Sequence, residues 1–202
     1  MTNERSEWQG QWLYVSLDGE MTGIDLTSGA ALISVGAATW ENKPGESIHT
    51  YYSMMNPGEM TWSPEAAAVH GLSQQEVKQS KSASEVDDEL SQWLTNLGAS
   101  RGQVIPVGVN FASFDGPFFK KYLPKTSALL SHRTVDINSL CFTWACATGK
   151  SFSEVKTQMY AMANNLLDES GIPVREHDAG FDAAQALTVW HAFVQNITGD
   201  NI

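Results

Sequence analysis

Short apolar segments separated by turn residues fill the first third of the chain, and this pattern constrains the fold most. Residues 13–18 alternate apolar and polar side chains, as a half-buried strand does. Residues 32–40 and 48–54 are rich in β-branched and aromatic side chains, and Pro44-Gly45 marks a turn between them. Three such segments joined by short links predict an antiparallel meander.

Helical periodicity begins after this meander. Val86, Leu90, Trp93, Leu94 and Leu97 share one helical face, and Gly98 is suited to end that helix. Alternating elements follow: a buried strand at 104–109, a helix from residue 116, a strand at 134–136, and helices at 137–148, 154–168 and 179–195. This order predicts an α/β domain with a mixed sheet, three antiparallel strands and then parallel strands, flanked by helices. We expect a flexible tail at 1–10 and one domain over 11–198.

Composition excludes several classes of protein. No run of 18 apolar residues occurs, so we expect no membrane span and no membrane partner. The polar first ten residues carry no apolar signal core, and two cysteines five positions apart fit neither a disulfide framework nor a metal site. We therefore expect a cytoplasmic protein in which Cys141 and Cys146 are buried thiols.

The net charge of −11 argues against a protein that coats long nucleic acids, because phosphate contacts usually come from Lys and Arg. Four of the acids are candidates for a metal site, which would reduce that objection. The one local concentration of basic side chains is either a solvated helix face or a phosphate contact: Lys120, Lys121, Lys125 and Arg133.

Three acids follow predicted strands. Asp18 and Glu20 are two apart, so on a strand their carboxylates point to the same face and repel unless a cation lies between them. The alternative is that they end the strand and face water. Asp115 follows the predicted buried strand, where ligands often bind in α/β sheets, although helix N-caps are also commonly Asp.

Another pair of candidates lies at the start of the last predicted helix. His177 precedes this helix and Asp182 falls in its first turn. Taken alone, Asp182 is explained as an acid that stabilises the helix dipole, and His177 is explained as an ordinary loop residue. Asp178 is a competing carboxylate that we rank lower. Four carboxylates and one imidazole are nevertheless what two hard metal ions and a base require.

Together these segments resemble the three motifs of the DEDDh 3′–5′ exonuclease superfamily. The first is similar at Asp18-Gly19-Glu20, the second at Asn110 and Phe114-Asp115, and the third at His177 and Asp182. Met21-Thr22-Gly23 is especially similar to oligoribonuclease, and residues 56–73 and 132–136 also resemble relatives. The resemblance spans residues 13 to about 195 and implies an RNase H-like fold.

The resemblance also implies roles. Asp18, Glu20, Asp115 and Asp182 would hold two Mg²⁺ or Mn²⁺ ions, and His177 would be the general base. The residues expected to bind substrate are Met21, Thr22, Gly23, His70, Asn110 and Phe114. The expected activity removes nucleoside 5′-monophosphates from the 3′ end of short single-stranded nucleic acid, with RNA slightly favoured. Many relatives are homodimers, so a homodimer is expected.

Two other functions stay open at this point. One is DNA 3′-end trimming or proofreading by the same chemistry. The other is a non-catalytic adaptor that binds nucleic acid or protein through a Trp-rich surface. The connection between Gly23 and Ile33 is longer and more polar than in many relatives, which affects the terminal-nucleotide pocket. Trp62 is a candidate for core packing or for stacking on a base.

Overall fold

The computed structural model describes residues 12–41, 47–169 and 178–198. The predicted tail at 1–10, the Pro44-Gly45 turn and His177 lie outside these ranges. The strands of the described residues form one sheet: β1 (Leu13–Met21), β2 (Leu32–Trp40), β3 (Ile48–Asn56), β4 (Lys81–Ser82), β5 (Val104–Gly108) and β6 (Val135–Asp136). No helix among the described residues has the length and apolarity needed to cross a bilayer.

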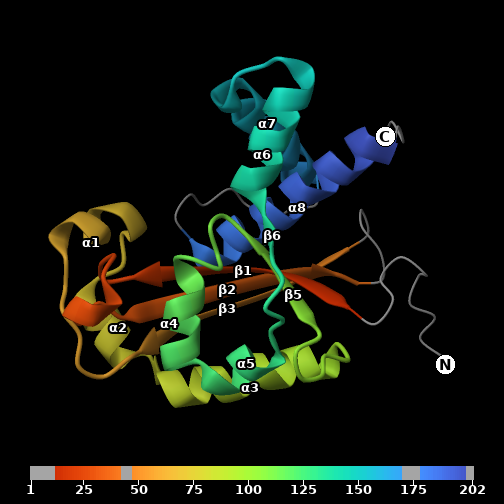
Figure 1. Ribbon diagram of the computed structural model, residues 1–202. Helices are drawn as coiled ribbons and strands as arrows, with labels where there is room; N and C mark the ends of the chain where they lie inside the picture. The colour runs from red at the N-terminus through yellow and green to blue at the C-terminus, as the bar shows by residue number, and fades with distance from the viewer. Residues whose placement is uncertain (1–11, 42–46, 170–177, 199–202) are drawn as a thin grey trace.

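The strand order is β4-β3-β2-β1-β5-β6 (Figure 1). β1, β2 and β3 pair antiparallel, whereas β5 pairs parallel to β1 and β6 parallel to β5. The predicted meander and the predicted mixed sheet are therefore confirmed. The short strand β4, which pairs parallel to the end of β3, was not predicted because two residues carry no alternation.

Helices cover both faces of the sheet. On one face lie α6 (Ile137–Thr148), α7 (Phe152–Glu169) and α8 (Ala179–Thr198); on the other lie α3 (Ala83–Asn96), α4 (Asp115–Tyr122) and α5 (Pro124–Leu129) (Figure 1). All nine residues of β2 are buried, since this strand is covered from both sides. The core accordingly forms two hydrophobic clusters separated by the sheet.

Four short elements were not predicted: η1 (Leu26–Ser28), α1 (Pro64–His70), α2 (Gln74–Gln79) and α5. Each has three to seven residues, too few to show an amphipathic period. Their ends are instead set by local hydrogen bonds, such as the one that the Ser63 hydroxyl accepts from Ala66 N–H.

The prediction of two buried thiols is half wrong. Cys141 on α6 is buried, but Cys146, five residues later on the same helix, faces solvent.

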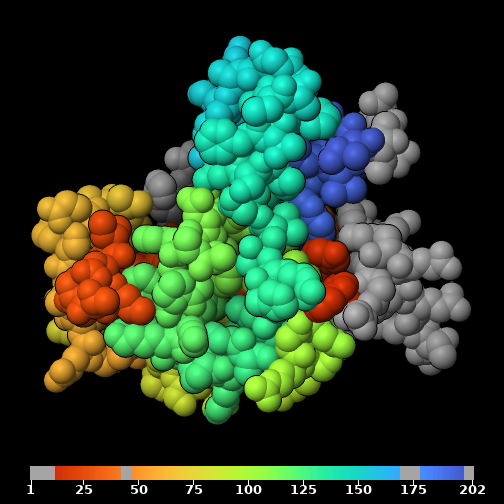
Figure 2. Space-filling view, viewed as in Figure 1, coloured from red at the N-terminus to blue at the C-terminus, as the bar shows by residue number. Residues whose placement is uncertain are grey.

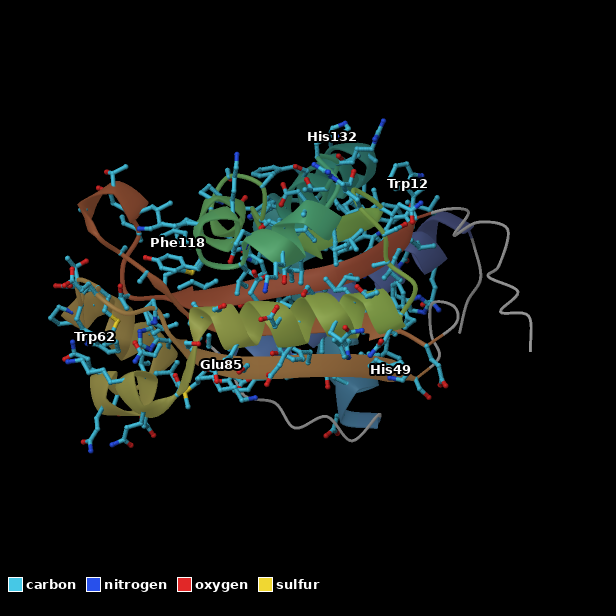
Figure 3. All side chains as sticks on the ribbon, turned by 90° about the horizontal axis from the view of Figure 1, so that it is seen from below. Trp12, His49, Trp62, Glu85, Phe118 and His132 are labelled. Carbon is cyan, nitrogen blue, oxygen red and sulfur yellow. The ribbon has the colours of Figure 1, made fainter. Side chains whose placement is uncertain are left out.

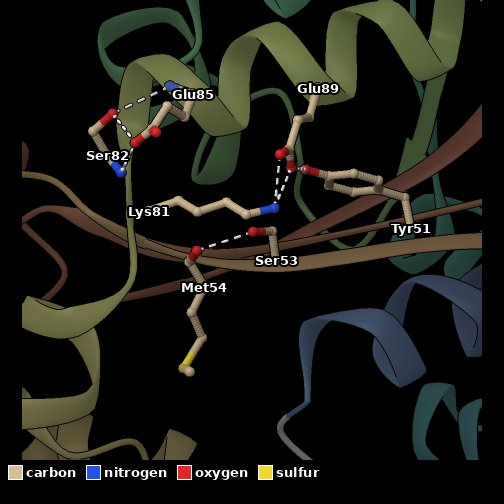
Figure 4. A network of polar contacts seen from close by, with 7 residues as sticks. All are labelled: Tyr51, Ser53, Met54, Lys81, Ser82, Glu85 and Glu89. Carbon is tan, nitrogen blue, oxygen red and sulfur yellow. Dashed lines mark hydrogen bonds and ion pairs between the residues drawn. The ribbon is translucent and has the colours of Figure 1, made fainter.

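Polar contacts tie α3 to the edge of the sheet (Figure 4). The Lys81 ammonium lies 2.7 Å from both carboxylate oxygens of Glu89, and the Tyr51 hydroxyl donates to the same carboxylate at 3.3 Å. Ser82 and Glu85 form a reciprocal capping box at the start of α3. These exposed contacts fix the direction of α3, while Val86 and Leu90 supply the buried face predicted from the sequence.

The start of α8 lies directly against the backbone of β2 at Gly36. An added Cβ at Gly36 would lie 1.8 Å from the carbonyl oxygen of Ala179 and 2.5 Å from the amide nitrogen of Gly180. Gly36 pairs with Asp18 across the sheet, so this contact brings the first turn of α8 beside the middle of β1. A side chain at position 36 is incompatible with this approach.

We predict that Gly36→Ala displaces the start of α8. Its methyl group must push the helix from the sheet, so the free energy of unfolding should fall by about 1–3 kcal/mol. Chemical denaturation measures this loss. Gly23→Ala is a matched control, because its added Cβ would meet the Ala30 Cβ at 3.4 Å, an ordinary contact. Equal stability of the two variants would contradict the close approach of α8.

Candidate metal and nuclease site

Three of the four predicted metal ligands converge. Asp18 and Glu20 on β1 and Asp182 in the first turn of α8 each offer a carboxylate oxygen, and these three atoms lie within 4.8 Å of one another. All three residues are half-buried. The strand alternation predicted from the sequence puts Asp18 and Glu20 on the α8 side of the sheet, and the close contact at Gly36 supplies Asp182.

Asp115 approaches from the other side of β1. It is the first residue of α4, follows β5 through a short loop, and is 4% exposed. The backbone N–H groups of Asp115 itself and of Gly19, which lies between Asp18 and Glu20, both lower the pKa of its carboxyl group. An effect of Gly19 on this carboxyl group places Asp115 beside the acidic strand, which a simple helix N-cap would not require.

Burial and mutual repulsion dominate the electrostatics of this cluster. Burial, followed by the charges of Asp115, Glu20 and Asp182, raises the pKa of Asp18 well above its ordinary value. Burial, followed by the charges of Asp182, Asp115 and Asp178, raises the pKa of Glu20 from 4.5 to about 8. Burial raises the pKa of Asp115 from 3.8 to about 7, although the backbone N–H groups of Asp115 and Gly19 oppose this shift. Four carboxylates in this setting favour protons or cations.

Asp136 positions the loop that carries Asp115. Asp136 is the N-cap of the next helix, because its carboxylate accepts from Asn138 and Ser139 N–H at the start of α6. The same carboxylate also accepts from Asn110 N–H at 3.0 Å. Asn110 has a φ of 56°, a conformation that Asn tolerates better than most residues, and its carbonyl accepts from Phe114 N–H. This second role of Asp136 depends on tertiary contact.

Three of the predicted substrate residues present surface near the acids. Asn110 and Phe114 are exposed in the loop before Asp115, and Phe114 retains 39% of its surface. Gly23 is half-buried and lines a hollow of about 550 Å³ between the end of β1 and α1. Trp62 lines the same hollow, and Figure 3 shows it at the α1 end of the molecule.

The other three predicted substrate residues are buried. Met21 is 6% exposed and packs in the core, which argues against substrate contact by its side chain. The Thr22 hydroxyl accepts from Ala31 N–H, so it joins the end of β1 to the start of β2. His70 accepts from Leu72 N–H through Nδ1, whereas its Nε2 is buried and has no hydrogen-bond partner among the described residues. Of these, His70 alone keeps a polar atom for a ligand.

Asp178 immediately precedes α8 and competes with Asp182 in the sequence. Its carboxylate accepts from Gly180 and Phe181 N–H at 3.0 and 3.1 Å, so it caps the helix. Asp182 lies in the acidic cluster, which supports ranking it above Asp178. His177, the expected base, directly precedes this cap but lies outside the described residues.

Three of the four basic residues in the local concentration noted in the sequence have partners nearby. Lys125 forms an ion pair with Asp88 on α3. Lys121 lies 4.9 Å from the ring centroid of Tyr122, and Arg133 lies 5.4 Å from that of Trp12. Figure 3 shows Trp12 and His132 at the end of the molecule opposite Trp62. These partners favour the solvated-face interpretation of this basic set.

A mixed sheet of this order with four carboxylates around its central strand defines a nuclease domain of the RNase H-like type. The sequence model of the family described as exonuclease, RNase T, matches residues 15–190. This chain therefore belongs to the exonuclease family, within the DEDDh 3′–5′ exonuclease superfamily. No curated protein matches the chain by sequence.

Solved structures share the fold at low identity. Cell-death related nuclease 4 is 14% identical with a TM-score of 0.63, over 91% of this chain and 64% of that protein. Exonuclease I from Methylocaldum szegediense is 14% identical with a TM-score of 0.66, over 94% and 41%. E. coli exonuclease I with a dT13 oligonucleotide is 14% identical with a TM-score of 0.64, over 94% and 43%. The chain spans less than two thirds of each of these proteins.

We predict that divalent cations stabilise the protein more at pH 8 than at pH 5. The raised pKa values mean that the folded protein binds more protons than the unfolded chain, so without metal stability falls as pH rises from 4.5 to about 8. Bound Mg²⁺ or Mn²⁺ neutralises the carboxylates in place of those protons, so it restores the stability that is lost at high pH. Melting temperatures with saturating Mg²⁺ and with EDTA, at both pH values, measure the effect.

Asp18→Asn is the informative variant for this prediction. Removing one charge relieves the repulsion, so the metal-free variant should melt higher than the native protein at pH 8 and respond less to Mg²⁺. Asp88→Asn, which removes an exposed acid on α3, is the control and should leave the response to Mg²⁺ unchanged. A native protein whose melting temperature at pH 8 is the same in Mg²⁺ and in EDTA would contradict the assignment.

Proposed function

We propose that the protein is a metal-dependent 3′–5′ exonuclease that shortens single-stranded nucleic acid from its 3′ end. The observation that carries this proposal is the convergence of Asp18, Glu20 and Asp182 within 4.8 Å, with Asp115 beside the same strand. Structural likeness at 14% identity supports the fold but does not by itself establish the substrate.

The donor set fits two hard divalent cations. Four carboxylates, of which Asp18, Glu20 and Asp115 have raised pKa values, supply oxygen ligands and the negative charge that Mg²⁺ or Mn²⁺ prefers. Asp18 would contact both ions, Glu20 and Asp182 would hold one, and Asp115 would hold mainly the other. Bound ions would supply a nucleophilic water at neutral pH and stabilise charge on the phosphate oxygens.

The side chains then have distinct tasks in hydrolysis. His177 accepts a proton from the attacking water, for which an imidazole with a pKa near 6.5 is suited. The water oxygen bonds to the terminal phosphorus, the bond to the upstream 3′-oxygen breaks, and that oxygen takes a proton. A nucleoside 5′-monophosphate leaves. The exposed ring of Phe114 and the unpaired Nε2 of His70 are the groups that would contact the terminal nucleotide.

Short single strands are the proposed substrate. A chain with 12 basic against 23 acidic residues supplies a limited phosphate footprint. RNA is slightly favoured because Met21-Thr22-Gly23 resembles oligoribonuclease, while the dT13 complex of E. coli exonuclease I supports DNA trimming as the second candidate. The acidic cluster argues against the third, a non-catalytic adaptor. We also propose that the protein is a homodimer, as many relatives are, and light scattering tests this.

Digestion of 3′-labelled RNA and DNA oligomers of equal sequence tests the proposal. With Mg²⁺ or Mn²⁺ the label should be released as a 5′-mononucleotide, and EDTA should abolish release. His177→Ala should reduce kcat by about 10²- to 10⁴-fold, the usual contribution of a general base. Asp18→Asn should abolish turnover without unfolding the protein.

Each competing function gives a different result in the same assay. Faster release from DNA than from RNA would favour the trimming enzyme. Binding of labelled oligomers without any metal-dependent cleavage would favour the adaptor. Full activity of His177→Ala would show that another group, or solvent, takes the proton.

A further inference from the structure

The helices α6 and α7 form a hairpin that projects from the sheet above the loop that follows β5 (Figure 2). Two contacts tie this hairpin to the acidic cluster. At the start of α6, the bond from Asn110 N–H to Asp136 joins it to the loop before Asp115. Farther along, Gln185 on α8 donates to Asn164 on α7 at 2.6 Å, about one turn beyond Asp182. The hairpin is therefore fixed relative to the acids.

A stripe of partly buried side chains runs along α7 toward this cluster. Phe152, Lys156 and Tyr160 recur every fourth residue, so they lie on one face. They lie one position beyond the buried stripe that includes Val155 and Met159, at the border between core and solvent. These three residues line a hollow of about 430 Å³ together with Ser153 and Thr157.

One end of the stripe lies at the proposed metal site. After burial and a contribution from Cys141, the charges of Asp182, Asp18 and Asp136 all raise the pKa of Tyr160, which reaches about 12. The geometry agrees, because Asn164, four residues after Tyr160 on α7, accepts from Gln185, three residues after Asp182 on α8. The stripe is thus continuous with the site where a 3′ end would be cleaved.

The other end of the stripe presents an aromatic surface. Phe142 on α6 stacks on Phe152, with ring centroids 4.2 Å apart and planes at 21°. Phe142 keeps 57% of its surface exposed. An exposed, pre-stacked pair of rings is a suitable platform for a nucleobase, because every base has a π-face.

Between these ends lies a cation in a strongly acidic protein. The Lys156 ammonium sits 5.4 Å from the ring centroid of Tyr160 and forms no ion pair with any residue in the described ranges. Aromatic rings interleaved with a positive charge are the pattern of single-strand binding sites. A second copy of this chain, with its net charge of −11, is a poorer electrostatic match for Lys156 than a phosphate.

We propose that this stripe is a binding subsite for the nucleotides upstream of the scissile phosphate. Lys156 would contact a backbone phosphate and the Phe142–Phe152 pair would stack on a base. The eight residue steps of helix from Phe152 to Tyr160 span about 12 Å. At about 3.4 Å per stacked nucleotide of one strand, this is about three to four nucleotides. The inference rests on the proposed exonuclease function and specifies its substrate length.

The test compares substrates with and without upstream nucleotides. The p-nitrophenyl ester of thymidine 5′-monophosphate reports the chemistry alone, whereas DNA and RNA oligomers of two to eight nucleotides also engage the subsite. For the native protein, kcat/KM should rise with length up to about five nucleotides and then level off, since the subsite is about three to four nucleotides long.

Phe142→Ala and Lys156→Ala should each lower the ratio of octamer to ester kcat/KM by about tenfold, the scale of one lost stacking contact. Phe142 is exposed, so its removal does not endanger the fold, and circular dichroism checks Lys156→Ala. Lys150→Ala is the matched control, because it removes the same charge from the same hairpin but Lys150 bonds to Gln158. Its ratio should stay at the native value.

The outcomes separate this inference from the proposed function. Metal-dependent turnover of the ester, with no rise with length and with native ratios for both variants, would overturn the subsite alone. A Lys150→Ala ratio as low as that of Lys156→Ala would reduce the effect to general electrostatics and overturn it as well. A dimer that dissociates in Phe142→Ala, with unchanged ratios, would assign the rings to a second copy instead. Failure to cleave any substrate would overturn the function first.

Discussion

The close packing of α8 on the backbone of β2 is the contact on which the site depends. Asp18 and Glu20 are local partners on one strand, but the third converging carboxylate belongs to a helix more than 160 positions later in the chain. Gly36 lets that helix approach until the Ala179 carbonyl occupies the space of a side chain. The three carboxylates repel one another at this distance. The repulsion is tolerated because packing of the two hydrophobic clusters holds β1 and α8 in place.

A backbone hydrogen bond holds the loop of the remaining acid. The loop before Asp115 is fixed by the carboxylate of Asp136, which accepts from Asn110 N–H and also caps α6. One residue therefore couples the metal site to the helical hairpin proposed to guide the upstream strand. In the proposed mechanism, cations bound at this site would relieve charge repulsion between carboxylates that the fold already brings together.

Sequence reasoning worked best where the spacing of apolar residues along a segment shows which of its faces are buried. The alternation of β1, the apolar run of β5 and the periodicity of α3 gave the central elements. It failed for α1, α2, α5 and β4, which are too short for a period. It also expected substrate contact from Met21, because a motif reveals residue type but not that the end of β1 turns this side chain into the core.

By itself, the sequence determined the α/β class, the antiparallel and then parallel strands and the residue types of the acidic cluster, because these follow from local periodicity and from carboxylate chemistry. Only the tertiary structure decided that Asp182 and not Asp178 joins Asp18 and Glu20, and that the loop before Asp115 is held by Asp136. It also decided that Phe142 and Phe152 stack across two helices. These relations join residues far apart in the chain, so they depend on how the elements pack rather than on any local pattern.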